Sequence, residues 1–553
     1  MEKNNNAHSE EGKPDESLMK TVLELVKFFA DYDAKGMIPR KSSEKSMIFR
    51  DEGNKLYRQN KHTETHYRKV LSFYTKSIAY APLESEELAL ALSNRSTLWL
   101  HLHRYDLSLI DIDKALQLTK PTTELSGRLQ TRKLKCLNLY KSYMAVEDDN
   151  QELKPMINRL YSSPKLFRLV NEEKPEVPRF IDDVMPELPK FKSSKSIHCA
   201  ADSITMLHNK KYGRHYIAAR DIKPGEVLMS EESPYVSVEF DQMYLICSHC
   251  LAFAWTAIPC DHCVFAVYCS ETCKNIAWSQ YHDVQCSILP FLNSGVYEEK
   301  DLSSVNELVR MTIIILKREG LETVLKKEKH EQQKKDATNL CNPDPMSGGK
   351  FKSIDSLMLS SYDTENDEKD ITITVTTLLS LLFTSEDILR DHFRYNRGKV
   401  DHDTLFSLGI VLKRFYLIQK LNSFKFQVSP CVCNDHTMCR IKPDEVFYRG
   451  SILGFYSSLF NHSCDPNVSK IFLPGPKIVF FAVRPIKQGE QLFISYVPAP
   501  EWGKESRQKR LQEKYSFSCD CKRCKADWQG LYGLFPQVTI NFSVIVMQSG
   551  EYF

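Results

Sequence analysis

The chain has 553 residues, a formal net charge of +3, 42% apolar residues and 11% aromatic residues. This length is enough for three or four domains with sizeable cores, and the near-balanced charge gives no whole-chain electrostatic argument for binding nucleic acid or an anionic membrane. The 17 cysteines, an odd number, fall mostly into closely spaced pairs typical of metal ligands rather than of disulfides, which indicates a reducing compartment.

The first 47 residues form a polar tail with one predicted helix over residues 18–32. Residues 1–17 lack the apolar core of a secretory signal. The longest apolar-leaning run, residues 371–383, is interrupted by threonines and a serine and is too short to cross a bilayer. We therefore expect a soluble protein of the cytoplasm and nucleus that does not associate with membranes.

Residues 48–143 show helical apolar periodicity and a weak internal repeat. The segments 52–57 and 73–78 are followed by similar segments at 91–96 and 114–116, with small and aromatic residues at offsets that let paired helices stack. The pattern resembles tetratricopeptide repeats, with two clear copies and a degraded third over residues 128–143. A generic helical bundle is the alternative interpretation.

Residues 144–195 are proline-rich and charged, which predicts a linker with short helices. From residue 196 to residue 246 the pattern changes to short strands punctuated by turns. Two of these strands, residues 217–219 and 227–229, are predicted on either side of the turn Lys223-Pro224-Gly225.

Eight residues between positions 247 and 286 have the spacing of zinc ligands. The partners of each pair are separated by two or three residues, and the pairs are Cys247 with Cys250, Cys260 with Cys263, Cys269 with Cys273, and His282 with Cys286. One such pair can bind a tetrahedral ion from a single turn, so four pairs complete two sites. A segment of about forty residues with little apolar material needs such ions to fold. The alternative is a set of scattered buried cysteines.

This pattern resembles a MYND zinc finger at all eight positions. The pairs interleave in that family, which implies one ion on Cys247, Cys250, Cys269 and Cys273, and a second ion on Cys260, Cys263, His282 and Cys286. His249 and His262 lie inside the pairs but off the pattern, and we predict that they are not ligands.

Residues 287–430 are predicted to form a mostly helical insertion, with helices at 305–318 and 405–422. Within it, the charged low-complexity segment 326–369 is expected to be disordered. Strands return in residues 431–500, at 468–472, 477–483 and 491–495. Residues 501–527 carry the last cysteines, and residues 528–553 form a tail.

The motif Asn461-His462-Ser463-Cys464-Asp465-Pro466-Asn467 is a poor core segment but suits a loop that hydrogen-bonds a polar ligand. Together with residues 489–496, 213–225 and 517–524, it resembles the SET domain of protein-lysine methyltransferases. A SET domain interrupted by a MYND finger defines the SET-and-MYND-domain family, and the upstream helices point to its tetratricopeptide-bearing subgroup. The expected fold is therefore an α+β multidomain fold, with N-terminal helical repeats, a β-rich SET domain and a zinc-bound C-terminal segment.

The resemblance implies methyl transfer from S-adenosyl-L-methionine to a lysine of a protein substrate. Tyr496 would orient the lysine amine and the methyl group, and Tyr515 would form another wall of the lysine channel. The residues implied to contact the cofactor are Gly213, Arg214, Asn434, Ser458, Phe460, Asn461, His462, Tyr496 and Phe517. Arg214 and His215 depart from the smaller residues that many relatives have at these positions.

A third metal site is expected at the C-terminal cysteines. Cys519, Cys521 and Cys524 supply three ligands, whereas a closed structural zinc site needs four. The resemblance implies Cys464 as the fourth ligand, which would tie the C-terminal segment to the cofactor loop and bring the expected number of zinc ions to three. A rival cluster consists of Cys431, Cys433, His436 and Cys439.

The alternative to an enzyme is a non-catalytic adaptor that recruits peptide partners through the MYND finger and the helical repeats. Repeats that hold the acidic tails of heat-shock chaperones use a carboxylate clamp of basic and asparagine side chains. The chain has such residues at similar offsets, namely Arg50, Asn54, Asn94, Arg128 and Arg132. Direct binding of nucleic acid is not expected, because the basic residues do not gather on one helix or face.

Residues 525–553 are too few for the helical roof that covers the substrate cleft in relatives. Residues 538–547 form an uncharged, strand-like stretch. We therefore expect an open cleft and low activity, unless the N-terminal repeats cover the cleft.

Overall fold

The structure is a computed structural model, and it describes residues 39–59, 64–148, 190–293, 299–328, 374–378, 402–428, 447–473, 475–497 and 503–526, with parts of the segment 20–31. The predictions for Asn434 and its rival metal cluster, for most of the linker 144–195 and the insert 326–369, and for the residues after 526 lie outside these ranges. Within the described ranges, no helix is long and apolar enough to span a membrane.

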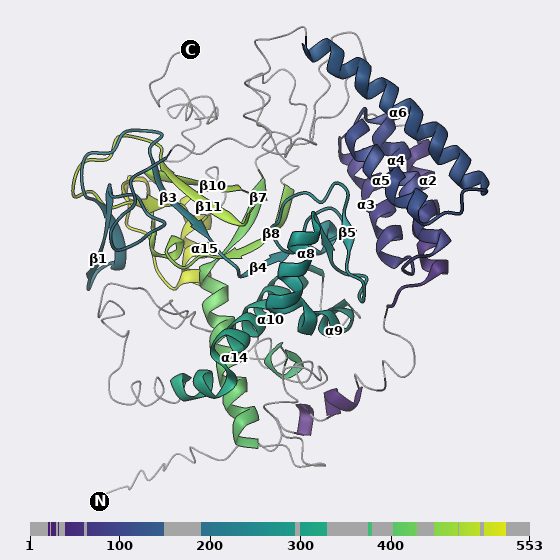
Figure 1. Cartoon of the computed structure of the whole chain (residues 1–553). Helices are drawn as coiled ribbons and strands as arrows, with labels where there is room; N and C mark the ends of the chain where they lie inside the picture. The colour runs from purple at the N-terminus through teal and green to yellow at the C-terminus, as the bar shows by residue number, and fades with distance from the viewer. Residues whose placement is uncertain are drawn as a thin grey trace, which may run out of the picture.

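The N-terminal region is helical, as the periodicity predicts (Figure 1). Its helices are α2 (Ser43–Arg58), α3 (Glu64–Tyr80), α4 (Glu86–His101), α5 (Tyr105–Gln117) and α6 (Glu124–Asp148). Ser42 and Ser85 begin α2 and α4 by accepting hydrogen bonds from backbone N–H groups three residues further on. A Cβ atom at Gly53 would lie 2.7 Å from the ring of Tyr74, so only glycine allows α3 to pack this closely on α2.

A buried ion pair joins α4 to α5. The Nε and Nη2 atoms of Arg95 donate hydrogen bonds to the two carboxylate oxygens of Asp111, and each donor–acceptor distance is 2.8 Å. Both side chains are fully buried. The paired geometry offsets the cost of removing the two charges from water. Removing either partner would leave an uncompensated charge in the core, so the pair fixes how these helices stack.

The N-terminal helices share a hydrophobic core with the rest of the protein. Trp99 of α4 is completely buried and makes an edge contact with Trp255, with ring centroids 6.1 Å apart. Trp255 in turn stacks on Phe253 at 4.5 Å. Both of these aromatic residues lie in the cysteine-rich segment. The helices are therefore packed directly against this segment, an arrangement that the sequence did not reveal.

Short strands build the β-rich part of the chain. The strands are β1 (Ile204–Asn209), β2 (Gly213–Ala218), β3 (Val227–Glu232), β4 (Val236–Val238), β7 (Ser423–Val428), β8 (Phe447–Leu453), β9 (Asn461–His462), β10 (Val468–Leu473), β11 (Lys477–Ala482) and β12 (Phe493–Ile494). Antiparallel pairing gives the hairpin β1-β2 and the sheets β10-β11-β3 and β4-β8-β7, whereas β9 and β12 pair in parallel.

The sheet β4-β8-β7 has a tight crossing at Gly450 of β8. A Cβ atom there would lie 1.8 Å from the carbonyl oxygen of Ser237 in β4, so no other residue fits without moving the backbone. Strand β8 of this sheet leads into the loop before Asn461, so the close contact at Gly450 helps to position that loop. Lys425 lies in β7 of the same sheet.

The cysteine-rich segment lies between the N-terminal helices and the sheets, and the helices of the insertion lie below the sheets in the view of Figure 1. The segment contains β5 (Ile258–Pro259), β6 (Val267–Tyr268), α8 (Glu271–Ala277), the π-helix η3 (Trp278–His282) and α9 (Asp283–Phe291). The insertion contributes α10 (Glu299–Glu319) and α14 (His402–Asn422). Buried Glu307 of α10 accepts hydrogen bonds from Gln419, Ser423 and Ser451, over 2.8–2.9 Å, and so ties the insertion to the sheet β4-β8-β7.

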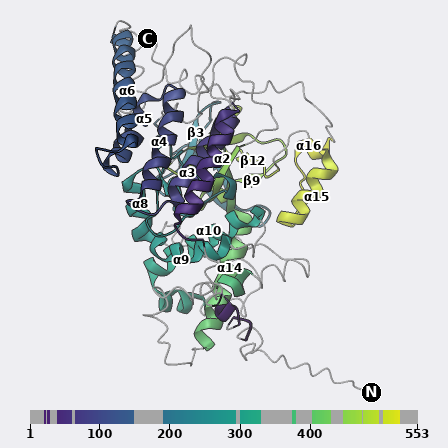
Figure 2. The same cartoon turned by 90° about the vertical axis from the view of Figure 1, so that its right-hand side faces the viewer.

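The chain ends, within the described residues, in α15 (Lys504–Tyr515) and the short α16 (Lys522–Lys525). Figure 2 shows these two helices on the opposite side of the molecule from α6. The helices predicted at 305–318 and 405–422 lie within α10 and α14, and the strands predicted at 468–472 and 477–483 correspond to β10 and β11. The strand predicted at 491–495 is shorter, because only Phe493 and Ile494 form the parallel ladder with β9.

Candidate active site and metal centres

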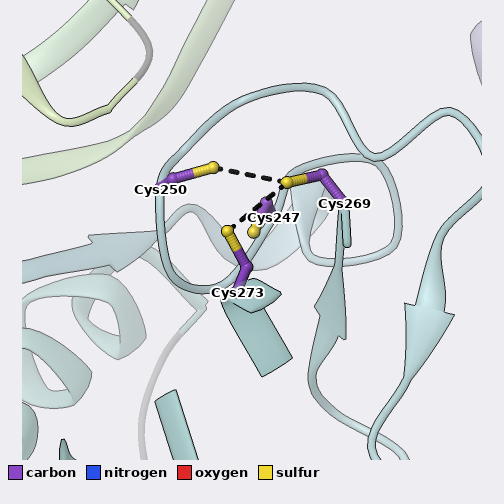
Figure 3. Close-up of side chains that lie close together, drawn as sticks. All are labelled: Cys247, Cys250, Cys269 and Cys273. Carbon is purple, nitrogen blue, oxygen red and sulfur yellow. Dashed lines mark hydrogen bonds between the residues drawn. The ribbon is translucent and has the colours of Figure 1, made fainter. Parts of the chain in front are cut away.

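Four cysteines of the finger converge on one point (Figure 3). The sulfur atoms of Cys247, Cys250, Cys269 and Cys273 all lie within 4.8 Å of one another. Cys250 is 3.5 Å from Cys269, and Cys269 is 3.6 Å from Cys273. Ser270 caps the helix α8 by accepting from the backbone N–H of Cys273, which fixes the second pair.

A second group contains Cys260, Cys263, His282 and Cys286, and all four side chains are buried. The sulfur atoms of Cys260 and Cys286 are 3.8 Å apart, and the Cys263 sulfur is 3.6 Å from Nε2 of His282. The π-helix η3 ends at His282 and the helix α9 carries Cys286. The pairs therefore interleave as the resemblance implied. His249 and His262 belong to neither group, and their rings lie beside Tyr281 and Trp278.

The third group joins two distant parts of the chain. Cys464 lies with Cys519, Cys521 and Cys524, and its sulfur is 3.5 Å from that of Cys524. The buried Arg507 of α15 donates through Nη2 to the Cys524 sulfur over 3.8 Å. This cation offsets part of the negative charge that thiolates would bring to the site.

These donor sets fit zinc. Four thiolates at the usual Zn–S distance of about 2.3 Å in a tetrahedron lie about 3.8 Å from one another. Neighbouring sulfur atoms within the three groups lie 3.5–3.8 Å apart, which agrees with this spacing. Sulfur-rich, buried sets of four ligands are typical of closed structural zinc sites rather than of catalytic ones, which keep an open position.

The predicted catalytic aromatic residues lie together near the third group. The Tyr496 ring is 4.7 Å from that of Tyr515 and 5.3 Å from that of His462, and His462 is 6.0 Å from Phe517. Burial raises the pKa of Tyr496 above its ordinary range and that of Tyr515 to about 12. Both hydroxyls are therefore protonated near neutral pH. The Tyr496 hydroxyl donates to the carbonyl oxygen of Phe460 over 2.7 Å.

His462 connects this tyrosine to the metal-type group. Its Nδ1 atom accepts from the backbone N–H of Tyr496 over 2.9 Å, while Nε2 is 3.2 Å from the Cys464 sulfur. Burial lowers the pKa of His462 to about 4, so the imidazole is neutral and Nδ1 is free to accept. The parallel pairing of β9 with β12 places the two motifs, 461–467 and 489–496, in this contact.

The other predicted cofactor residues border the same loop. Gly213, with a φ of +60°, begins β2, and the side-chain amide of Asn461 donates to the carbonyl of neighbouring Tyr212 over 3.0 Å. Ser458 donates to the carbonyl of Gly454. Phe460 is completely buried and stacks on Phe480 at 4.5 Å, so its backbone carbonyl, rather than its ring, faces Tyr496. Arg214 follows Gly213 in β2.

Two residues that sequence reasoning gave no role hold the loop in place. The side chain of Asn467 donates to the carbonyl of Gln491 over 2.9 Å and accepts from the N–H of Phe493 over 2.8 Å, which links the two motifs. Buried Glu231 of β3 accepts from the N–H groups of Phe455, Tyr456 and Ser457, over 2.8–3.1 Å, and from the Ser457 hydroxyl. Glu231 follows Val227, Leu228 and Met229 in β3 and is itself followed by Glu232, so the sequence carries no clear signal that it is buried.

Replacing Glu231 with alanine is expected to destabilise the fold. The three backbone N–H groups would lose their acceptor inside the protein, and each buried donor without a partner costs about 1–3 kcal/mol. Chemical denaturation should therefore show a loss of at least this size in the free energy of unfolding. Neighbouring Glu232 is exposed and, among the described residues, its side chain makes one ion pair, with Lys477 at 3.8 Å, so Glu232→Ala is the matched control. Equal stabilities of the two variants would contradict the role given to Glu231.

The family model of the SET domain matches residues 213–497. The protein-lysine N-methyltransferase SMYD4 of Mus musculus is 24% identical, over 88% of this chain and 68% of its own length. The histone-lysine N-methyltransferase SMYD3 of Homo sapiens is 43% identical over 17% of this chain and 21% of its own length.

Among solved structures, the SET domain of LSMT bound to lysine and AdoHcy matches 59% of this chain and 54% of that chain, with 11% identity and a TM-score of 0.26. At that TM-score the likeness supports no argument about this chain.

Proposed function

The chain belongs to the SET domain family, in the branch that carries a MYND finger, and on this basis we propose that it is a protein-lysine N-methyltransferase that uses S-adenosyl-L-methionine. The observation that carries the proposal is the junction of β9 and β12, which brings the Tyr496 hydroxyl, the Phe460 carbonyl and the His462 ring together beside Tyr515. The relatives SMYD4 and SMYD3 are named for the same reaction on protein lysines.

The chemistry of methyl transfer suits these residues. The reaction is an in-line displacement that needs a neutral amine, an aligned geometry and little water. A buried, protonated tyrosine can orient the amine and stabilise charge at the methyl group through its hydroxyl, while aromatic rings form the walls of an apolar channel. Tyr496 would have the first role, and Tyr515 would contribute to the walls.

The cofactor is proposed to bind beside this junction. Asn461 and His462 would hold its amino-acid and adenosine parts, Phe517 would stack on the adenine, and Gly213 would allow close approach of the backbone. Arg214, Asn434 and Ser458 complete the proposed set. S-adenosyl-L-methionine would supply the methyl group, and the chain would bind, orient and desolvate the two reactants.

Each of the three cysteine-rich groups is proposed to hold one zinc ion. The support is the tetrahedral spacing of the donors, and the chemistry supplied by zinc would be structural. In the described parts of the chain every cysteine is free of a disulfide, which favours a reducing compartment, and we propose the cytoplasm and nucleus. The finger is also proposed to contact peptide partners, since Ile276 and Trp278 on its surface are 37% and 40% exposed.

A direct experiment tests the function. Purified, zinc-loaded protein is incubated with S-adenosyl-L-methionine labelled on the methyl group and with a lysine-containing protein library, and methyllysine is identified by mass spectrometry. Cofactor-dependent methyllysine is the expected result. A zinc-loaded protein that binds no S-adenosyl-L-methionine by calorimetry would favour the adaptor function instead.

The N-terminal helices are proposed to be tetratricopeptide repeats that bind an acidic C-terminal peptide, such as a heat-shock chaperone tail. The pairs α2–α3 and α4–α5, followed by α6, support the repeat assignment. The amide of Asn94 donates to Asn54 over 2.9 Å, and Arg132 donates to the carbonyl of Ser93 over 2.8 Å, so residues of the proposed clamp from α2, α4 and α6 lie on neighbouring helices. Nη1 of Arg50 is buried without a hydrogen-bond partner among the described residues.

The clamp predicts that the double variant Asn54→Ala/Arg128→Glu binds an acidic chaperone-tail peptide at least about tenfold more weakly, a change of about 1.4 kcal/mol in binding free energy. The side chain of Arg128 is 61% exposed and, within the part of the chain that the structure describes, makes one ion pair, with Glu124 at 3.8 Å, so its replacement should not disturb the fold. Fluorescence anisotropy measures the affinity. Lys135→Glu, an equal charge change on the same helix, is the control, and equal binding by the wild type and the double variant would refute the clamp.

A further inference from the structure

A small cavity lies where the finger meets the insertion. It has a volume of about 30 Å³ and is lined by residues of the finger, of α10, and of the segment that contains β4 and the 3-10 helix η2 (Phe240–Gln242). Figure 1 shows α10 beside α9 and next to β4. Phe240, Met243 and Asn293 in the lining are half-buried, so the cavity is accessible from solvent. Because one water molecule needs about 10–15 Å³, the cavity has room for about two or three waters or for a small polar ligand.

One charged side chain in the lining has donors without a partner. Arg310 of α10 is 2% exposed, and among the described residues its Nε and Nη1 atoms are buried without a hydrogen-bond partner. Its guanidinium lies over the ring of Tyr281, 4.1 Å from the ring centre. This contact stabilises the positive charge but gives the N–H donors no oxygen acceptor. A buried cation that lacks an anionic partner is destabilising, so this position is suited to an anion that enters the cavity.

The acidic residues nearby on the same two helices are engaged elsewhere. Glu307, one turn earlier on α10, accepts hydrogen bonds from three side chains of α14 and of the sheet β4-β8-β7. Asp283 of α9 pairs with Lys317, two turns further along α10. Arg310 is the one charged residue among the described residues that line the cavity. In these parts of the chain, therefore, the cavity has a positive charge and no carboxylate of its own to match it.

The rest of the lining combines amide and hydroxyl groups with an apolar wall. Ser303, Asn306 and Arg310 are three and four residues apart, so they share one face of α10. Gln285 of α9 is 1% exposed, and its Nε2 atom donates to Oδ1 of Asn306 over 2.5 Å, which holds the two amides in place. The apolar wall is formed mainly by Phe265, Leu289, Leu292 and Leu302. A ligand that fits this lining has one negative charge and a short apolar part.

We propose that this cavity binds a short-chain monocarboxylic acid, with the carboxylate on Arg310 and the alkyl chain against the leucines. A planar guanidinium matches a carboxylate through two parallel N–H bonds, and a single cation suits a monoanion better than a phosphate, which carries more charge. The small volume favours a free acid over the bulkier end of a peptide. None of the predicted catalytic or cofactor residues lines the cavity, so the proposal does not depend on methyl transfer.

Ligand binding to the full, zinc-loaded chain tests the proposal. Saturation-transfer NMR, which is suited to weak ligands, compares propionate with its neutral analogue propionamide, and competition gives the two affinities. Propionate should bind at least about tenfold more tightly, because only the charged carboxylate matches the guanidinium. Propionate should also raise the Tm progressively with its concentration, because it binds the folded state and not the unfolded one.

Two variants act on the cavity in different ways. Arg310→Gln removes the cation, and Leu302→Phe keeps the cation but fills part of the cavity, so each should weaken propionate binding by at least about tenfold. If one of them does not fold, the other still decides. Arg318→Gln is the matched control, because Arg318 lies on the same helix, is 52% exposed and does not line the cavity, and it should bind propionate as the wild type does. Native mass spectrometry checks the zinc content of each variant.

Each other result overturns the proposal. Equal binding of propionate and propionamide would do so, and so would propionate binding that the two cavity variants leave unchanged. Displacement of propionate by equimolar chloride or inorganic phosphate would assign Arg310 to anions in general. A leucine-ended peptide with a free carboxylate that binds more tightly than propionate, and depends on Arg310, would assign the cavity to the end of a peptide. Loss of zinc from Arg310→Gln, with no propionate binding by the wild type, would make Arg310 a counter-charge for the thiolates of the finger.

Discussion

Replacing Tyr496 with phenylalanine is expected to lower the turnover of methyl transfer by about 10²–10³-fold, the usual effect of losing one preorganised hydrogen-bonding group at a reacting centre. The variant loses the hydroxyl that donates to the Phe460 carbonyl over 2.7 Å. Its ring keeps the contacts with His462 and Tyr515. The fold and all three metal groups should therefore stay intact.

The affinity for S-adenosyl-L-methionine should fall much less than the turnover, because Asn461, His462 and Phe517 are proposed to hold most of the cofactor. Calorimetry measures that affinity, and methyl transfer to a lysine substrate measures the turnover. Tyr515→Phe is the matched comparison, since it removes a neighbouring hydroxyl but keeps the ring that would form the channel wall, and its turnover should fall less. Unchanged turnover in Tyr496→Phe, with the wild type active, would remove Tyr496 from the catalytic role.

The sequence predicted correctly the features that depend on residues close together in the chain. Pairs such as Cys247 with Cys250 can bind one ion from a single turn, and the tetrahedral requirement means that four pairs complete two sites. Which pairs share an ion came only from the family resemblance. Strands such as β10 and β11 follow from alternating apolar residues between turns. The meeting of Cys464 with the C-terminal cysteines, across more than fifty residues, came only from resemblance, because spacing cannot measure such a distance.

The sequence was insufficient where packing joins distant elements. The sequence of residues 48–143 does not show that Trp99 packs on Trp255 of the finger. An aromatic residue at a buried helical position could equally well pack inside the N-terminal helical bundle. From the sequence alone, a glutamate such as Glu231 would be expected at the surface. It is buried because the backbone N–H groups of residues 455–457 donate hydrogen bonds to its carboxylate. These features are tertiary contacts between distant segments. Neither segment alone predicts such a contact, because the role of each residue depends on its partner in the folded structure.

The replacement of Cys464 with serine should damage metal content and cofactor binding together. Cys464 is the member of the third metal group that comes from the loop of Asn461 and His462, and its sulfur lies 3.5 Å from Cys524 and 3.2 Å from His462 Nε2. A zinc ion left with three protein ligands would be held weakly, and structural zinc contributes about 10–16 kcal/mol of apparent folding free energy in small modules. The C-terminal segment would then detach from the loop.

Detachment would also displace Tyr515 and Phe517, which lie in that segment beside Tyr496 and His462. Native mass spectrometry should therefore show two zinc ions in Cys464→Ser and the proposed three in the wild type, and calorimetry should show cofactor affinity reduced by at least about tenfold, or about 1.4 kcal/mol. Cys136→Ser is the control, because Cys136 is buried in α6 and belongs to none of the three metal groups, and it should retain three ions. Three ions and full cofactor affinity in Cys464→Ser would show that this residue does not join the metal site to the cofactor loop. Loss of the ion with full affinity would show instead that the loop keeps its shape without the zinc, through contacts such as those of Asn467 and Glu231.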